Sequence, residues 1–195
     1  MKKEFKNLLV GLAIGDGHIT KNKKSLRIQH STKQKEYLQY KADLINSYLG
    51  EVKVVLHEFD NSGYPGVRIW FNHPFCRYVR NWLYKDGYKK IKKELLYRLT
   101  DREIAIWYMD DGSLYESHKG TGSAELVIST YCETEDEALD LIEFMQRRYD
   151  AKFTVKRNKG KFSIRCGKNA AKKFLSKIQP FIIDSMKYKT FEDSK

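Results

Sequence analysis

One short pattern occurs twice in this chain: an apolar run of helical length that ends in Asp-Gly. The first copy is residues 9–17 (LVGLAIGDG) and the second is residues 104–112 (IAIWYMDDG). Their aspartates, Asp16 and Asp111, are separated by about half the length of the 195-residue chain. A repeat at this spacing predicts two similar half-domains, each of which contributes one carboxylate from the end of a helix.

The position of these carboxylates is electrostatically unfavourable. Gly17 and Gly112 are typical helix stops, so we expect Asp16 and Asp111 on the last turn of each helix. A carboxylate there meets the negative end of the helix dipole, which costs roughly 0.3–1 kcal/mol. If the two helices pack together, the like charges also repel, and a bound cation is the usual remedy. A single copy would fit an ordinary core helix, but two copies indicate a metal site.

The segments after each motif follow the same order of strands and helices. In the first half, residue patterns predict strands over 25–31, 52–57 and 67–70, and helices over 33–49 and 74–86. In the second half, they predict strands near 113–117, 124–131, 152–156 and 161–165, and helices over 134–149 and from about 168 onward. We therefore expect an α+β fold of two pseudo-symmetric αββαββα half-domains, residues 1–87 and 101–195, joined by a basic connector over 88–100. The motif helices are expected to pair at the centre.

The exposed face of the predicted strands is polar and basic. When the apolar residues of these strands face a core, the opposite face carries donors and cations: Arg27, Gln29, Ser31, Lys53, Arg68, Ser129, Lys152, Lys156, Lys161 and Arg165. The formal net charge of +12 and the isoelectric point near 9.4 also indicate a polyanionic partner. Such strands fit the major groove, so we expect two antiparallel sheets that form one saddle for double-stranded DNA.

Cysteine usage and hydropathy narrow the class of protein further. Cys76, Cys132 and Cys166 are scattered, which argues against a disulfide framework or a zinc site and fits a reducing compartment. No segment approaches the roughly eighteen apolar residues of a membrane span, so no membrane partner is expected. The expected location is the cytoplasm of a bacterial, archaeal or phage-infected cell, or an organelle. Because both motifs lie in one chain, we expect a monomer.

These features together resemble the LAGLIDADG homing endonucleases, specifically the single-chain branch with two motifs. Residues 107–113 (WYMDDGS) are close to the usual second motif of that branch, and residues 9–17 are a recognisable first motif. The likeness covers nearly the whole chain, and its tail around Tyr188 and Lys189 is similar to the omega-type intron-encoded enzymes. The resemblance implies a site-specific DNA endonuclease that makes metal-dependent double-strand breaks and promotes homing of an intron or similar element.

The resemblance also implies a metal site. The family's metal-binding aspartates match Asp16 and Asp111, and Gly15 and Asp110 stand beside them in that site. Asp110 fills a small-residue slot of the motif and is not expected to be a principal ligand. Carboxylate-held divalent metals can activate water and stabilise the leaving oxygen, and hard oxygen ligands suit Mg²⁺, with Mn²⁺ as a substitute.

Related enzymes place basic residues near the metals. Lys189 matches one of these by its Tyr-Lys context. For the other, both Lys89 and Lys90 align, and the spacing to Asp111 does not decide between them. Lysines in this place can polarise water or stabilise charge, so all three are candidate catalytic residues.

Two other functions on the same scaffold remain open from the sequence. A maturase would bind intron RNA and help its intron to splice, and such a protein can keep the fold and the aspartates. A non-catalytic DNA-binding regulator would be expected to lose one or both carboxylates, whereas this chain has both. Cleavage of intronless target DNA in the presence of metal distinguishes the endonuclease from both.

Overall fold

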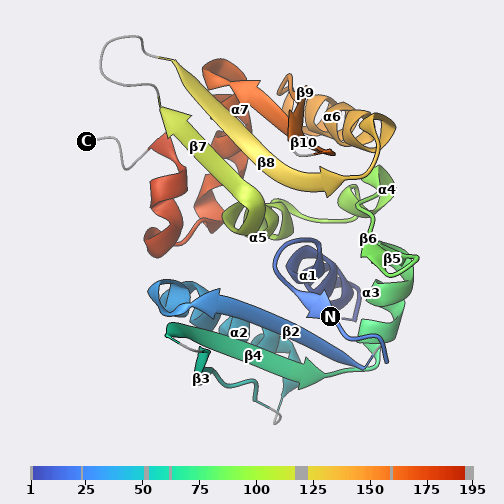
Figure 1. The fold of residues 1–195 in the computed structure, drawn as a ribbon, viewed down its shortest axis with the longest axis vertical. Helices are drawn as coiled ribbons and strands as arrows, with labels where there is room; N and C mark the ends of the chain where they lie inside the picture. The colour runs from blue at the N-terminus through green and yellow to red at the C-terminus, as the bar shows by residue number, and fades with distance from the viewer. Residues whose placement is uncertain are drawn as a thin grey trace. The chain divides into compact units, whose positions relative to one another are not determined.

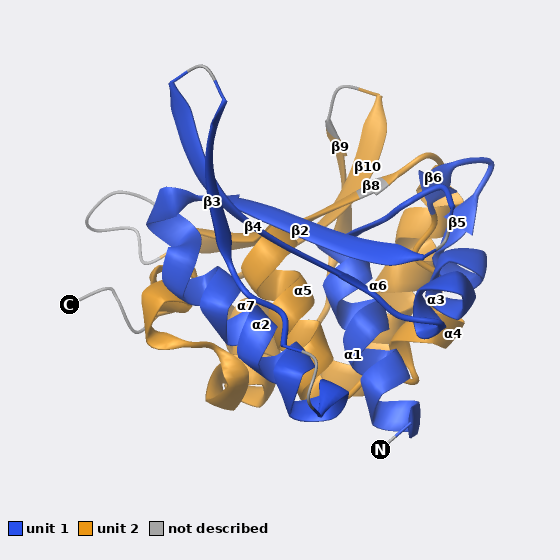
Figure 2. Cartoon of the chain, turned by 90° about the horizontal axis from the view of Figure 1, so that it is seen from below, with its two compact units in different colours: residues 1–89 blue, residues 90–195 orange. Residues whose placement is uncertain are grey.

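The computed structural model, shown in Figure 1, describes residues 2–22, 24–50, 53–61, 63–116, 123–158 and 160–191. The chain divides into two compact units, Met1–Lys89 (unit 1) and Lys90–Lys195 (unit 2), which Figure 2 colours separately. The segment expected as a connector, 88–100, is thus divided between the units after Lys89. Each unit is described by itself below.

Unit 1 contains one four-stranded antiparallel sheet covered by helices. Its elements are α1 (Lys2–Ile14), β1 (His18–Ile19), β2 (Ser25–Ser31), the 3-10 turn η1 (Thr32–Gln34), α2 (Lys35–Leu49), β3 (His57–Asn61), β4 (Tyr64–Asn72), α3 (Phe75–Leu83), β5 (Tyr84–Lys85) and β6 (Tyr88–Lys89). The strand order in the sheet is β1-β2-β4-β3. Helix α2 packs on β2 and β4, and α1 packs on α2 and α3.

Unit 2 repeats this arrangement. Its elements are α4 (Lys93–Leu96), α5 (Asp101–Asp111), β7 (Gly112–Glu116), β8 (Ala124–Cys132), α6 (Glu135–Tyr149), β9 (Thr154–Asn158), β10 (Lys161–Gly167), α7 (Lys168–Ile178), and the 3-10 turns η2 (Gln179–Phe181) and η3 (Asp184–Lys189). Its sheet has the order β7-β8-β10-β9, which is the order of unit 1. The expected α+β fold with an αββαββα order in each half is therefore confirmed.

The two motif helices are core helices. Every residue from Leu8 to Ile14 in α1 is buried, and so is every residue from Glu103 to Met109 in α5. A helix that is apolar around its whole circumference is stable only when it is covered on all sides. At the start of α5, the Glu103 carboxylate accepts hydrogen bonds from the backbone N–H of Thr100 at 2.9 Å and from its hydroxyl at 2.6 Å. These bonds fix where the second motif helix begins.

The motif glycines end their helices for a different reason than the sequence suggested. Neither Gly17 nor Gly112 adopts the left-handed conformation of a typical helix stop. Instead, a Cβ on Gly17 would lie 2.3 Å from the carbonyl oxygen of Leu12, and a Cβ on Gly112 would lie 2.1 Å from the ring of Tyr108. The backbone N–H of Gly17 donates to that Leu12 oxygen at 2.9 Å. Both glycines are therefore required by close packing against the preceding helical turn.

One predicted strand lies elsewhere in the chain. The segment 52–57 was expected to be a strand, but residues 53–56 are irregular and β3 begins at His57; Val52 lies outside the described residues. The cause is Asn46 on α2, whose side chain accepts a hydrogen bond from Val54 N–H at 2.7 Å and donates one to Val54 C=O at 3.0 Å. Because Asn46 satisfies both backbone groups of Val54, this segment follows α2 instead of joining the sheet.

The predicted helix over 74–86 is shorter than expected. Helix α3 ends at Leu83, and Asp86-Gly87 forms the turn of a small hairpin in which Lys85 pairs with Tyr88. Both turn residues have positive φ, 51° for Asp86 and 87° for Gly87. That conformation is typical of a two-residue hairpin turn. The hairpin positions Lys89 at the end of β6.

The packing at the motif glycines gives a stability prediction. Gly112→Ala should lower the free energy of unfolding by about 1–3 kcal/mol, because the added methyl group overlaps Tyr108. Gly167→Ala is the matched control, since a Cβ at Gly167 has open space and its φ is −80°. Because Gly167 is the N-cap of α7, where glycine is preferred over alanine, we expect the control to lower stability by less than about 1 kcal/mol. Urea unfolding measures both, and equal effects would contradict the packing argument.

Candidate functional site

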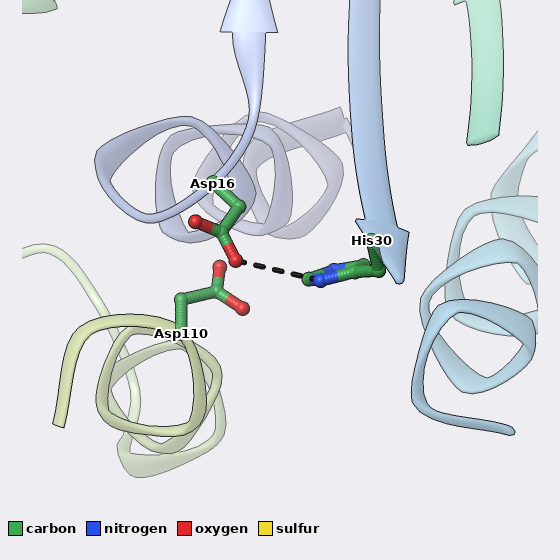
Figure 3. Close-up of side chains that lie close together, drawn as sticks. All are labelled: Asp16, His30 and Asp110. Carbon is green, nitrogen blue, oxygen red and sulfur yellow. Dashed lines mark ion pairs between the residues drawn. The ribbon is translucent and has the colours of Figure 1, made fainter. Parts of the chain in front are cut away.

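Asp16 lies just beyond the end of α1, where the chain turns into β1. Its carboxylate is partly open, with 40% of the side chain exposed, and its Oδ2 lies 3.5 Å from Nδ1 of His30 on β2. Figure 3 shows these two side chains pointing toward each other. Asp16 was expected on the last helical turn, but α1 ends at Ile14 and Asp16 belongs to the turn that follows. The carboxylate is thereby held between the helix end and the first strands of the sheet.

A groove joins Asp16 to the outer surface of the unit 1 sheet. It has a volume of about 630 Å³, and Asp16, Gln29, His30 and Ser31 line one part of it. The 3-10 turn η1 and the adjoining ends of β3 and β4 line the rest, with Phe59 and Tyr64 among their residues. The predicted metal-binding carboxylate and two predicted DNA-contacting residues, Gln29 and Ser31, thus share one groove.

Lys89 and Lys90 have different surroundings, although the sequence did not distinguish them. The Lys89 ammonium group donates a hydrogen bond to the carbonyl oxygen of Gly15 at 2.6 Å. The Lys90 ammonium group instead pairs with the Glu137 carboxylate on α6 at 2.8 Å. Partial burial acts to raise the pKa of Glu137, but its hydrogen bonds, chiefly that from Lys90, outweigh this and lower it. The structure therefore places Lys89 beside the first motif and Lys90 in a structural ion pair.

The positive charge of Lys89 also affects the residues that follow the first motif. Burial lowers the pKa of His18, and the positive charges of Lys89, Arg80 and Arg27 lower it further. Arg80 anchors the strand that carries His18, because its guanidinium group donates to the carbonyl oxygen of Ile19. The turn after Asp16 is thus held from α3 and lies in a positive environment.

The second motif has a matching arrangement in unit 2. Asp111 is the last residue of α5, as expected, and Asp110, which Figure 3 labels at the end of the same helix, precedes it. The Lys189 ammonium group donates to the carbonyl oxygens of Met109 at 2.5 Å and Asp110 at 3.2 Å. The Tyr108 hydroxyl in turn donates to the Lys189 carbonyl oxygen at 2.6 Å. In the motif alignment Asp110 corresponds to Gly15, so each motif has a lysine at the same carbonyl group.

The donor set in each motif suits a hard divalent cation. Unit 1 offers the Asp16 carboxylate and unit 2 the Asp111 carboxylate, and the carbonyl oxygens of Gly15 and Asp110 beside them accept hydrogen bonds from Lys89 and Lys189 in this structure. Magnesium prefers such oxygen ligands and keeps several water molecules, which requires an accessible carboxylate. The partial exposure of Asp16 meets this condition. The residues present therefore fit a Mg²⁺ or Mn²⁺ ion.

The outer face of the unit 1 sheet carries the predicted cations and donors. In the antiparallel register Arg68 lies opposite Gln29, and Trp70 lies opposite Arg27, so these side chains share one face. The guanidinium group of Arg68 lies 5.3 Å from the ring centres of both Phe59 and Trp70. Aromatic contacts of this kind restrict an arginine while leaving its donors available. Lys53 is not part of this face, because it lies in the irregular segment before β3.

On the outer face of the unit 2 sheet, the predicted cations are paired with glutamates. Glu125 on β8 forms ion pairs with Lys156 at 3.0 Å and with Arg165 at 2.9 Å, and Lys161 pairs with Glu133. The hydrogen bond from Lys156 is the main cause that lowers the pKa of Glu125. Ser129 is half-buried on β8, and Lys152 is exposed but precedes β9, which begins at Thr154 rather than at 152.

Sequence patterns alone did not single out two buried polar residues near Asp16. His30 is 7% exposed and Lys41 is fully buried, and the Lys41 ammonium nitrogen lies 3.0 Å from Nε2 of His30. A signal was present in the sequence. His30 occupies the apolar side of an alternating strand, and Lys41 interrupts the apolar stripe of α2 between Leu38 and Ile45.

Comparison with known proteins agrees with this geometry. The family model described as "LAGLIDADG DNA endonuclease family" matches residues 6–174. The structure of the homing endonuclease I-WcaI bound to its DNA recognition sequence superimposes with a TM-score of 0.79 at 27% identity, and covers 96% of this chain and 85% of that one. The chain belongs to the LAGLIDADG DNA endonuclease family.

Individual relatives include proteins with two different descriptions. A probable intron-encoded endonuclease 1 of Wickerhamomyces canadensis is 28% identical over 97% of this chain and 84% of its own length. The cytochrome b mRNA maturase bI2 of Saccharomyces cerevisiae is 31% identical over 94% of this chain, which spans 46% of that protein. The structure of I-DmoI in complex with DNA and Mn has the same fold, with a TM-score of 0.56 at 14% identity, over 93% of this chain and 99% of that one.

The helices were compared with the length and hydropathy that a membrane span requires. In the part of the chain that the structure describes, none is both long enough and apolar enough to cross a bilayer.

Proposed function

We propose that this chain is a metal-dependent endonuclease that cuts both strands of a long duplex DNA site and so promotes the movement of an intron or a similar element. The observation that carries the proposal is the repeated motif end: an aspartate after a buried helix, with a lysine bonded to the carbonyl group just before it. Membership of the family and the DNA-bound relative I-WcaI support the same activity.

The proposed chemistry is hydrolysis of phosphodiester bonds. A bound divalent metal supplies an activated water and stabilises the leaving oxygen. Asp16 and Asp111 would hold this metal, with the carbonyl oxygens of Gly15 and Asp110 beside them. Lys89 and Lys189 would stabilise the negative charge that develops on the phosphate in the transition state. We favour Mg²⁺, with Mn²⁺ as a substitute, because the donors are hard oxygens.

The sheet faces would bind the DNA. In unit 1, Arg27, Gln29 and Arg68 have the side chains that read guanine and adenine edges in the major groove. In unit 2, the cations Lys156 and Arg165 would exchange their glutamate partner for DNA. The three buried, free cysteines suit a reducing compartment, and we place the protein in the cytoplasm or an organelle.

A maturase function is the second candidate, because the relative bI2 carries that description. The two are separated by incubating the purified protein with intronless duplex DNA and Mg²⁺. Duplexes selected for binding from a randomised pool in Ca²⁺ provide the substrate. Shortened duplex fragments in Mg²⁺ support the endonuclease, whereas binding to structured RNA without DNA cleavage would support the maturase.

The first prediction concerns the two aspartates. Asp16→Asn and Asp111→Asn should each abolish double-strand cleavage of the selected duplex, because an amide is a much poorer ligand for a hard cation. Binding of the same duplex in Ca²⁺ should stay within about threefold of the unchanged protein, since affinity comes mainly from phosphate contacts. Gel-shift and cleavage assays measure both. Parallel loss of binding and cleavage would mark the aspartates as structural.

The second prediction separates the two neighbouring lysines. Lys89→Met should slow cleavage by about 10²–10³-fold without weakening binding, because it removes a charge stabiliser beside the motif. Lys90→Met is the matched control and should change the rate less than about threefold, with a stability loss below about 1 kcal/mol from its Glu137 pair. Single-turnover cleavage rates and thermal unfolding give the answer. A larger rate loss for Lys90→Met would reverse the assignment.

The third prediction concerns the salt dependence of DNA affinity. Glu125→Gln should free Lys156 and Arg165 to bind phosphates, so the slope of log affinity against log salt should steepen by about 0.9 for each additional phosphate that is neutralised. Glu58→Gln removes the same charge beside Lys35, which is not on the proposed DNA face, and should leave the slope unchanged. Fluorescence anisotropy over a salt series measures the slopes. Identical slopes for both variants would show that Glu125 does not compete with DNA.

A further inference from the structure

A chain of buried polar groups runs inward from Asp16. His30 lies on the core side of β2, and only 2% of its side chain is exposed. Its Nδ1 contacts Gln34 Oε1 at 3.0 Å and lies 3.5 Å from Asp16 Oδ2, and its Nε2 contacts the Lys41 ammonium nitrogen at 3.0 Å. Lys41 also lies 4.2 Å from the ring centre of Tyr37. The proposed chemistry does not explain why these groups are buried together.

The neighbours of His30 define which ring nitrogen carries the proton. Nδ1 faces two oxygen atoms, from Gln34 and Asp16, so a proton there has acceptors while a lone pair would be repelled. Nε2 faces the Lys41 ammonium group, which only donates, so Nε2 must accept. Lys41 therefore favours the tautomer in which Nδ1 of His30 carries the proton, with Gln34 Oε1 as its hydrogen-bond partner at 3.0 Å and the Asp16 carboxylate 3.5 Å away.

Unit 2 lacks this arrangement at the equivalent positions. His18 on β1 and Ser113 on β7 each follow the motif glycine directly, so they occupy equivalent positions. His18 pairs with Arg27 and Ser113 pairs with Val127, so Arg27 corresponds to Val127. Three residues further along each strand, His30 corresponds to Thr130. Helices α2 and α6 both have 15 residues, and Lys41 corresponds to Leu141. Thr130 donates its hydroxyl hydrogen to the Phe162 carbonyl oxygen at 3.0 Å. A leucine at the place of Lys41 is the ordinary solution for this core position.

We propose that His30, oriented by Lys41, is a positioning residue that holds the Asp16 carboxylate for its metal ion, and that the two halves therefore bind metal with unequal affinity. The inference rests on the proposed function, in which Asp16 is a metal ligand. Donors that orient a ligating carboxylate raise metal affinity, and their loss weakens it by about 10–100-fold in other proteins. A buried lysine is costly to a fold, and an apolar residue of similar size is often tolerated or stabilising. A functional role accounts for the presence of Lys41 where the other half has Leu141.

The test measures Ca²⁺ binding by calorimetry on the protein bound to its selected duplex. An Asp111→Asn background leaves the Asp16 site to be measured alone. In this background His30→Leu should weaken Ca²⁺ binding about tenfold. His30→Asn should restore affinity to within about threefold, because the amide nitrogen takes the place of Nδ1 as a donor. Thr130→Val, the matched change in unit 2, should leave the affinity of this site unchanged.

Three results separate the possible failures. If Asp16→Asn does not weaken Ca²⁺ binding, the proposed function of Asp16 is wrong. If Asp16→Asn weakens it but His30→Leu does not, the positioning role alone is wrong. In an Asp16→Asn background, His30→Leu should not weaken Ca²⁺ binding further. An equal loss of Ca²⁺ affinity in that background would show that His30→Leu acts by disturbing the fold.

Lys41→Met provides a second variant in case His30→Leu does not fold. The proposal predicts weaker Ca²⁺ binding at the Asp16 site together with an unchanged or higher Tm. A purely structural lysine would give a lower Tm with unchanged affinity, which would overturn the proposal. In Mg²⁺, with Asp111 intact, both variants should accumulate nicked duplex, because the cut that depends on Asp16 is slowed more than the other.

Discussion

Each motif helix turns into a strand at a glycine that leaves no space for a side chain. At Gly17 the obstacle is the Leu12 carbonyl oxygen, and at Gly112 it is Tyr108. This close packing fixes the aspartate one residue before the glycine, next to the negative end of the helix dipole. The unfavourable charge is offset in each unit by a lysine at the carbonyl group before the aspartate, Lys89 at 2.6 Å and Lys189 at 3.2 Å. The glycines thus set the position of each aspartate, and a lysine from a distant segment of the same unit lies beside it.

The two halves share this frame but differ in what surrounds it. In unit 1 the aspartate is supported from the core by His30, and Arg68 on the sheet is restricted by two aromatic rings. In unit 2 the equivalent core positions are Thr130 and Leu141, and the sheet cations are held by glutamates. Two halves within one chain can differ in this way because each unit has its own copy of the frame and its own surrounding residues. The fold is repeated, and the chemistry around the motif is not.

Much of the fold follows from local sequence patterns, because alternation and apolar stripes report which side of an element is buried. The patterns fail where a side chain replaces backbone pairing, as Asn46 does for Val54. They also fail at Asp86-Gly87, which reads equally as a helix stop and as a hairpin turn, and the turn is what forms. The choice between Lys89 and Lys90 depends on that hairpin and could not be made from spacing. His30 and Lys41 were visible as polar residues on apolar faces, but their contact joins elements that only the folded chain brings together.

The central claim is that Asp16 and Asp111 each bind a divalent metal in the DNA complex. Anomalous diffraction from crystals of the protein with its selected duplex and Mn²⁺ tests it most directly, because manganese is located independently of any effect on activity. The account predicts anomalous density within about 2–2.5 Å of a carboxylate oxygen of both aspartates. Bound DNA with no manganese at either aspartate would contradict it.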